Sequence, residues 1–532
     1  MFKKIAYYYI LSSILFLTSC QDFLQEEAYD MKTNTNFFLT PEDAEMAMIG
    51  TYSYLADAYR QSTIEMLTQN SGAFNKGKKT NMWVAGSFDA TTKEVYETWD
   101  FFFALIDRSN DLIANVSQMD VLEDEDKAAI LGEARFLRAW SNFVLVRMYG
   151  RIPLRLEPTR GIDAGAVPLS SSEEVYSKVI LPDLKYAKQN CAAEYDASHA
   201  GRITSGAAAA ALSKVYLTLA GNVDGSAYWD SARVEAKWVM DTGLYQLTDD
   251  FNDLWTSKNT SESVFEVQYI RGIYGSGYSK IFTPAKSGWS AKNGGWSRST
   301  ATQKTYDDFR MTYEPAFPGN ADGKENGSND YGIPADYRVQ CTYVDQYVRT
   351  DNGRTTFIYP TQGYKASNDS WPQIAKWKDP EAPDNFQGDN NFIVIRYADV
   401  LLMYAEAENE VNGPTDLAYD AIDAILERAR KADGTARTAP ANWDRTAGLT
   451  KEEFREKVFN ERRFELCAEQ HLWFDLVRKG VDTFMAFKTA DNEHGRKTAK
   501  HGVYERGILF PIPATEMAAN SKIDVTDQNP GY

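Results

Sequence analysis

Cysteine and histidine are both scarce in this chain, which has four of each among its 532 residues. After Cys20 the remaining cysteines, Cys191, Cys341 and Cys467, are odd in number and widely separated. This pattern argues against a disulfide framework, and none of these residues has the spacing of a zinc site. We expect the three cysteines to be buried as small apolar side chains, and we expect neither a metal ion nor a cofactor.

Positive charge is also in deficit. The chain has 57 lysine and arginine residues against 75 aspartate and glutamate residues, a formal net charge of −18 at pH 7. A surface this acidic repels a phosphate backbone, which argues against nucleic-acid binding. Beyond the N-terminal segment no apolar run approaches the length of about 20 residues that spans a bilayer.

The N-terminus has the pattern of a secretory signal. Two lysines near the start precede a mostly apolar stretch that ends at Leu17. Together with the next three residues, Thr18-Ser19-Cys20, this leucine resembles the bacterial lipobox, in which the cysteine thiol is joined to diacylglycerol. We therefore predict a signal peptide at 1–19 and lipidation at Cys20. The alternative is an ordinary signal peptide that is cleaved near Ser19.

Helical periodicity dominates residues 39–244. Thr40-Pro41 predicts a helix start, with threonine as the N-cap and proline in the first turn. Two neighbouring stretches, 201–221 and 226–241, have the apolar spacing of a helix pair. Because alanines stand at the close contacts with aromatic residues between them, this pair resembles a tetratricopeptide unit.

The pattern changes at 245–395, where strand-like runs alternate with glycine, proline and polar stretches. Helical spacing returns at 396–532, where residues 450–453 (TKEE) form a capping box. We predict a mainly α fold, with a tetratricopeptide-like scaffold of helix pairs and a long irregular insertion that contains short strands. Residues 20–38 would form an acidic tether, and 39–532 one compact unit.

Two stretches near the C-terminus place charged residues inside apolar helices. Residues 460–466 read NERRFEL, and 473–478 read WFDLVR after Glu469. Together they resemble the ERR-x-EL…E-G-x-R-W-x-D-L-x-R signature of the SusD/RagB family. The chain departs from that signature at Gln470, where glycine is usual, and at Leu472, where a basic residue is usual.

Three further regions resemble the same family. Residues 396–407 are similar to its RYAEVLLxYAEA helix, and 510–513 (FPIP) and 528–532 (QNPGY) are similar to its closing segment. Trp99 and Asn110 fit its N-terminal helix. The resemblance therefore covers essentially the whole chain after the signal.

The charged residues of the signature are predicted to be structural. Charges inside apolar helices imply paired and at least partly buried groups, because an isolated buried charge is very unfavourable. We expect such ion pairs at five positions: Glu461, Arg462, Glu465, Asp475 and Arg478.

The resemblance implies a SusD-like α-superhelix and a function in nutrient capture. Members of the family are cell-surface lipoproteins of Bacteroidetes that bind a nutrient, usually an oligosaccharide. They act as a lid over a SusC-like TonB-dependent outer-membrane transporter. For this chain, that implies a non-catalytic glycan-binding protein at the outer membrane, anchored through Cys20, whose helical scaffold contacts the transporter.

A glycan site needs aromatic side chains on exposed loops, because the C–H face of a pyranose stacks on the π-face of tryptophan or tyrosine. The glycine-rich stretch 269–299 supplies Tyr274, Tyr278, Trp289 and Trp296. The alternative for each residue is that its ring packs beneath its own loop.

Asn81 and Trp83 form a second candidate group, in the loop before the Trp99 helix. Members of the family often contribute an aromatic side chain to the ligand from this region.

Two other functions remain open from the sequence. The same architecture would also suit a peptide or another non-sugar nutrient, and the aromatic loops favour sugar only weakly. A surface glycoside hydrolase is the second alternative, because its two carboxylates come together only in space. With 75 acidic residues in the chain, no particular pair is indicated.

Overall fold

The computed structural model describes residues 37–75, 82–161, 163–290, 294–313, 334–344, 346–358, 371–383, 386–432, 435–489 and 507–532. Helices make up most of this part of the chain, which confirms the predicted mainly α fold. Asn81 and Cys20, together with the whole signal peptide, lie outside the described residues.

The α-helices of the described chain are α2 (Pro41–Ala58), α3 (Gln61–Asn70), α4 (Met82–Ala85), α5 (Lys93–Val116), α6 (Asp124–Tyr149), α7 (Ser172–Val175), α8 (Leu181–Asn190), α9 (Ser205–Ala220), α10 (Ala227–Asp241), α11 (Asp253–Thr256), α12 (Tyr278–Phe282), α13 (Gln303–Tyr313), α14 (Tyr337–Thr342), α15 (Tyr397–Asn412), α16 (Asp416–Arg430), α17 (Lys451–Glu465), α18 (Leu472–Arg478), α19 (Val481–Thr489) and α20 (Ala514–Ala519). A π-helical stretch, Tyr176–Ile180, joins α7 to α8.

The strands are short, and they are β1 (Phe74–Asn75), β2 (Ile152–Pro153), β3 (Leu169–Ser170), β4 (Ser263–Val267), β5 (Thr300–Ala301), β6 (Tyr343–Val344), β7 (Gln346–Val348), β8 (Thr355–Phe357), β9 (Gln373–Ile374), β10 (Phe392–Arg396), β11 (Lys431–Ala432) and β12 (Thr435–Ala436).

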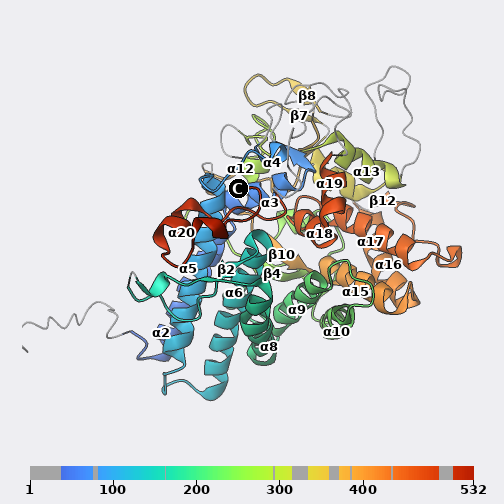
Figure 1. The fold of residues 1–532 in the computed structure, drawn as a ribbon. Helices are drawn as coiled ribbons and strands as arrows, with labels where there is room; N and C mark the ends of the chain where they lie inside the picture. Colours follow the sequence, from blue (N-terminus) through green and yellow to red (C-terminus); the bar gives the residue numbers. More distant parts are fainter. Residues whose placement is uncertain are drawn as a thin grey trace, which may run out of the picture.

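The long helices form a continuous stack in which each packs against the next. Helix α5 packs on α6, α6 on α8, α8 on α9, α9 on α10, and α10 on α15, which in turn contacts α16 and α17. In Figure 1 these helices fill the lower and central part of the molecule. The loop-rich segments around α12, β7 and β8 lie together at the upper end. The helix-pair scaffold and the loops thus occupy different parts of the protein.

The predicted capping signals begin the helices as expected. Thr40 accepts a hydrogen bond from the Asp43 backbone N–H, and the Asp43 carboxylate accepts one from the Thr40 N–H in return. Thr450 and Glu453 make the same reciprocal pair at the start of α17. Each pair satisfies two backbone donors that a helix start leaves free, which fixes where these helices begin.

Helix α9 lies deep in the scaffold because its sequence is rich in alanine. The five consecutive alanines 207–211 are fully buried. Small side chains let neighbouring helices approach closely, and α9 is packed between α8 and α10. At Gly206 the approach is tighter still, since a Cβ there would lie 2.3 Å from the Tyr245 hydroxyl.

Two small antiparallel sheets tie the insertion to the scaffold. Strand β10 pairs with β4 and leads directly into α15, and all five of its residues are buried. A four-stranded sheet in the order β1-β5-β9-β6 joins the segment after α3 to three parts of the insertion. The prediction of short strands within 245–395 is therefore confirmed, with β4 as one of them.

The C-terminal segment returns to the N-terminal helices. The Phe510 backbone N–H donates to the Met148 carbonyl at 2.7 Å. The Asn529 amide donates to the carbonyls of Tyr149 and Phe510, both at 2.7 Å. These contacts explain why the FPIP and QNPGY stretches occur together, because the second fastens the first to the end of α6.

One apolar core runs through the whole described chain, with members from Ala44 to Ile512. The three cysteines Cys191, Cys341 and Cys467 are free and buried, as predicted. Among the described residues, no helix is both long enough and apolar enough to cross a bilayer.

Glu465 stands at the centre of a buried network of ion pairs. Its carboxylate pairs with Arg338 at 2.7 Å, with Arg396 at 2.5 Å and with Arg428. Arg396 also reaches Glu262 and Glu469 at 2.7 and 2.8 Å. The network thereby connects α14, the end of β10, α16, α17 and the residue just before β4.

Glu461 also pairs with Arg338, at 2.5 Å, and a second set of buried ion pairs holds the other three signature residues. Arg462 pairs with Asp399 and Asp475, both at 3.0 Å. Arg478 pairs with Asp475 at 3.0 Å and with Glu406 at 2.6 Å. The prediction that the signature charges are paired and buried is confirmed.

The network makes stability depend on pH. Burial alone would raise the pKa of Glu465, but the Arg428, Arg396 and Arg338 guanidinium groups outweigh it and hold this pKa well below its usual range. The stabilisation from this lowered pKa is therefore fully present above the usual glutamate range and is lost as the pH falls below it.

We predict that Glu465→Gln lowers the free energy of unfolding by roughly 3–5 kcal/mol, because it leaves three buried guanidinium groups without their shared carboxylate. Differential scanning fluorimetry at neutral pH should show a clearly lower melting temperature. Glu456→Gln, at an exposed position of the same helix, is the matched control and should have little effect. Equal melting temperatures for the two variants would contradict a central role for Glu465.

Candidate functional site

Three of the predicted loop aromatics keep part of their side chain exposed. Trp289, Trp296 and Tyr274 are half-buried, and we call these three residues the aromatic loop surface. The segments that support them belong to the loop-rich end around α12, β7 and β8 (Figure 1).

Trp289 lies between two other loops of the insertion. The Lys378 ammonium group is 4.0 Å from its ring centroid, and the Tyr347 ring centroid is 6.4 Å away. Its backbone carbonyl accepts a hydrogen bond from the Asp379 N–H at 2.9 Å. The indole is thus fixed by residues that follow it by 58 to 90 positions in the sequence, and part of it stays accessible.

Trp296 is held against helix α12. Its backbone N–H donates to the Lys280 carbonyl at 2.7 Å. The Arg298 guanidinium carbon lies 4.2 Å from its ring centroid, and Phe386 packs edge-on at 5.5 Å. A cation therefore lies against each of the two half-buried tryptophans.

Tyr274 is tied to the scaffold through its hydroxyl. The hydroxyl donates to the Asp57 carboxylate near the end of α2, and the Arg60 guanidinium carbon lies 4.7 Å from the ring centroid. Burial, reinforced by the Asp57 carboxylate, raises the pKa of Tyr274. Because the hydroxyl is already bonded to Asp57, only the half-buried ring of Tyr274 is available to a ligand.

Two of the predicted ligand residues are core residues instead. Trp83 is 1% exposed and packs against Phe88 and Phe510, with ring centroids 4.8 and 5.9 Å away. Tyr278 is also 1% exposed, and its hydroxyl donates to the Tyr59 carbonyl at 2.6 Å. Neither ring has a free face, so we do not retain either as a glycan contact.

Lys378 is the neighbour of this surface that sequence reasoning missed. In the segment around it, Lys376 and Trp377 are buried, whereas Lys378 is exposed. Lys376 donates to Glu469 at 2.8 Å inside the core. The sequence shows two lysines flanking a tryptophan here, but not which lysine is buried or which tryptophan the exposed one contacts.

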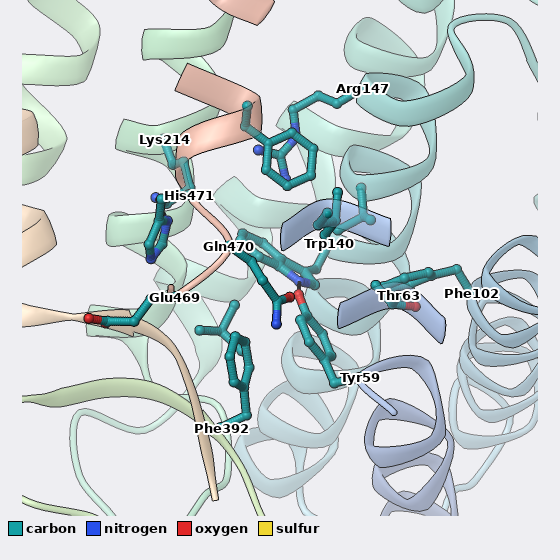
Figure 2. Close-up of a pocket in the computed structure, with 14 residues that line it drawn as sticks. Tyr59, Thr63, Phe102, Trp140, Arg147, Lys214, Phe392, Glu469, Gln470 and His471 are labelled. Atoms are coloured by element: carbon teal, nitrogen blue, oxygen red, sulfur yellow. Dashed lines mark hydrogen bonds between the residues drawn. The ribbon is translucent and has the colours of Figure 1, made fainter. Parts of the chain in front are cut away.

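Figure 2 shows a separate, partly enclosed cavity beside the signature helices. Its volume is about 30 Å³, enough for a water molecule or two and too small for a sugar. Gln470 points into it near Tyr59 and Trp140, and neither polar atom of its amide has a hydrogen-bond partner among the described residues. We therefore exclude this cavity as the glycan site.

The charged residues of this cavity are held by the protein itself. Burial, with the nearby Lys214 ammonium group, lowers the pKa of His471 to about 3. Lys214 pairs with Asp399 at 2.6 Å. Arg147 is stacked between two phenylalanine rings, with its guanidinium carbon 3.7 Å from the centroids of Phe143 and Phe474. These contacts describe packing rather than a reactive site.

A larger hollow, of about 720 Å³, lies between the starts of α2 and α6 and the end of α8. Four carboxylates line it: Glu42, Glu45, Glu125 and Asp126. Tyr195 is its aromatic residue, and no tryptophan is among its lining residues. Nor do the described residues contain a group of three or more histidine, cysteine, aspartate or glutamate side chains placed to hold a metal ion.

Comparison with known proteins identifies the family of this chain. The sequence profile of the SusD family matches residues 261–532, which is more than half of the chain. The chain belongs to the SusD family. A second profile, described as starch-binding and associating with the outer membrane, matches residues 22–217. The predicted family membership is therefore confirmed.

Individual relatives align with this chain over nearly its full length. SusD-like protein P2 of Formosa agariphila is 27% identical over 551 residues, covering 98% of each chain. A SusD homolog from Bacteroides thetaiotaomicron has a TM-score of 0.74 at 24% identity, covering 94% of this chain and 99% of its own. A laminarin-binding SusD-like protein has a TM-score of 0.68 at 22% identity, covering 93% and 100%.

The departure from the family signature at Gln470 has a structural consequence. The backbone there has φ = 67°, a left-handed conformation in which glycine is unstrained. For a residue with a Cβ this conformation costs roughly 1–2 kcal/mol, whereas the extra freedom of glycine in the unfolded chain costs about 0.5–1 kcal/mol. The SusD family signature, with glycine at this position, fits the geometry that the chain retains.

We predict that Gln470→Gly is more stable than Gln470→Ala by about 0.5–1 kcal/mol, since both remove the amide and only glycine relieves the left-handed strain. Comparing two variants that both lack the amide separates the backbone effect from the change in cavity volume. Denaturant unfolding followed by tryptophan fluorescence measures the difference. An alanine variant equal to or more stable than the glycine variant would contradict this account.

Proposed function

We propose that this protein captures an oligosaccharide at the cell surface and delivers it to a SusC-like TonB-dependent outer-membrane transporter. The observation that carries the proposal is the aromatic loop surface, where Trp289 and Trp296 stay partly exposed on a SusD-family scaffold. It is also supported by the profile described as starch-binding.

The chemistry of this surface suits a sugar. A pyranose presents a patch of C–H groups to an indole face, and its hydroxyls need polar partners held at fixed positions. Beside Trp289, the exposed Lys378 and the neighbouring loops supply such partners next to the ring. A half-buried indole also has little side-chain freedom left to lose on binding.

Binding and handover, without bond breaking, form the proposed mechanism. A glycoside hydrolase needs a carboxylic acid whose pKa is raised, so that it can protonate the leaving oxygen. Near the tryptophans, hydrogen bonds from Arg349 and Lys286 lower the pKa of Asp351 instead. Asp379 is 5% exposed and bonded to Arg271 at 2.6 Å. These carboxylates are suited to holding the loops.

The anchor and the partner complete the proposal. Two or more acyl chains on Cys20 would hold the protein at the outer membrane, and the tether 20–38 would keep it close to the transporter. We assign the contact with the transporter to the helical scaffold, because the loop-rich end would then remain free to receive the glycan (Figure 1). The profile described as associating with the outer membrane supports this location.

We predict that Trp289→Ala and Trp296→Ala each weaken glycan binding by about 1 kcal/mol or more, roughly fivefold, while the melting temperature stays nearly unchanged. Isothermal titration of the purified mature chain against plant, host and microbial oligosaccharides measures the affinity. Trp238→Ala is the matched control, because this partly exposed tryptophan lies on α10, in the scaffold.

Three outcomes would contradict the proposal. Binding of peptides with no binding of any glycan would show a different nutrient. Unfolding of both loop variants would show that these tryptophans are core residues. Glycan cleavage that a single carboxylate substitution abolishes would show that the protein is an enzyme.

We predict that Cys20→Ala abolishes acylation and membrane association, because the thiol is the proposed attachment point of the lipid. Labelling cells with an alkyne analogue of palmitate and fractionating them measures both properties. Cys191→Ala, a change at a buried cysteine, should keep the label. An unacylated, freely secreted wild-type protein with no transporter co-purifying would contradict both the anchor and the partner.

A further inference from the structure

We infer that the cavity of Figure 2 binds a small monovalent anion of halide size, held by Arg147 and Gln470. Arg147 belongs to α6, and Gln470 lies in the turn between α17 and α18. This site is separate from the aromatic loop surface, and its ligand is an ion from solution rather than the nutrient. The inference therefore does not depend on the proposed function.

The guanidinium group of Arg147 has no anionic partner among the described residues. The rings of Phe143 and Phe474 lie against it, each with its centroid 3.7 Å from the guanidinium carbon. Its Nε–H donates to the Phe143 carbonyl at 3.1 Å, whereas neither terminal nitrogen has a hydrogen-bond acceptor in the described part of the chain. Stacked rings cover only the faces of the group, so its edge, where the N–H donors lie, remains available to an anion.

Two carboxylates that could serve Arg147 are already engaged by other cations. Asp475, whose charge acts on Arg147, pairs with Arg462 and Arg478, each at 3.0 Å. Glu469, which lines the cavity, pairs with two other buried cations at 2.8 Å. Burial lowers the pKa of Arg147 to about 10, which leaves the group charged at neutral pH. A desolvated cation in this position is stabilised when an anion joins it.

Gln470 carries two energetic costs without a compensating contact in the described chain. The residue is 8% exposed, and neither polar atom of its amide has a hydrogen-bond partner there. Its backbone also has the left-handed φ of 67°. An unbonded buried amide and a strained backbone are both unfavourable, and such strain gathers at sites that bind a ligand. Because glycine is usual at this position of the family signature, the amide is a feature of this chain.

Other donors line the same cavity. The Tyr59 hydroxyl accepts a hydrogen bond from the Trp140 indole at 2.8 Å, and its own proton has no acceptor among the residues that the structure describes. The Lys214 ammonium group, paired with Asp399 at 2.6 Å, adds a further cation to the wall. A water molecule must donate as well as accept, whereas a halide only accepts. A wall rich in donors and positive charge therefore favours the halide over water.

The volume and the charge limit which anion can bind. A space of about 30 Å³ holds a water molecule or two, and a halide is of that size. Sulfate, phosphate and the acidic group of a sugar ring are too large to be enclosed. The single charge of Arg147 matches a monovalent ion. Such an ion would join α6 to the turn between α17 and α18, and so fasten the N-terminal scaffold to the signature helices.

The test measures thermal unfolding of the full mature chain by differential scanning fluorimetry at increasing sodium chloride or sodium bromide. Sodium methanesulfonate, whose anion is too large for the cavity, keeps the ionic strength constant. Gln470→Glu preserves the shape of the side chain and adds a negative charge that repels an anion. Arg147→Met removes the positive charge and keeps an unbranched side chain between the rings. Lys185→Met, at an exposed position of α8, is the control.

We expect chloride and bromide each to raise the melting temperature of the wild-type protein by roughly 1–3 °C, because a ligand that binds only the folded state stabilises it. Both cavity variants should lose this rise, whatever their own melting temperatures, and the control should keep it. Wild-type crystals soaked in bromide should show an anomalous peak in the cavity beside Arg147 and Gln470.

Two outcomes would overturn the inference. Bromide peaks confined to exposed cations, with an ordered water molecule in the cavity, would show that water is its ligand. A halide-dependent rise of equal size in the wild type and in both cavity variants would show that the ion acts elsewhere. If Arg147→Met fails to fold, Gln470→Glu and the bromide peak still decide between these results.

Discussion

The pairing of Glu465 with three arginines is the interaction on which the rest of the structure depends. These arginines come from α14, from the end of β10 and from α16, so one carboxylate joins the insertion to the C-terminal helical region. In a low-dielectric interior no member can be left alone, because an unpaired buried charge is far more unfavourable than a mismatched apolar contact. The network therefore fixes how these segments meet, whatever the loops between them contain.

This constraint explains why the loops can differ in character from the scaffold and still be well placed. Lys376 enters the core to reach Glu469, and two residues later Lys378 emerges beside Trp289. Because only two positions separate them, the buried Lys376 fixes the backbone from which the exposed Lys378 extends. Exposed side chains on such a loop can be substituted while the buried ion pair keeps the backbone in place. A functional site needs this kind of rigid support.

Much of the scaffold could be predicted from the sequence, because the signals were local. The caps at Thr40 and Thr450 depend on residues within one helical turn. The alanine run of α9 and the charged signature in α17 and α18 are short patterns that can be recognised in the sequence, although the ion-pair partners of the signature lie far away along the chain. The candidate site was predictable only in part. Trp83 faces Phe510, more than 400 residues away, and Tyr278 bonds to Tyr59, so no local pattern distinguished them from the half-buried Trp289 and Trp296.

Buried and exposed charges have different roles in this protein. Inside, cations and carboxylates are matched so closely that guanidinium groups hold the pKa of Glu465 far below its usual range. Such matched charges contribute to one arrangement of the fold and are unavailable to a ligand. Charges on the loops, such as the paired Lys286 and Asp351, are partly solvated, so each pair contributes little to the stability of the fold. A family that keeps the first set and varies the second can retain one scaffold while its loops adapt to different ligands.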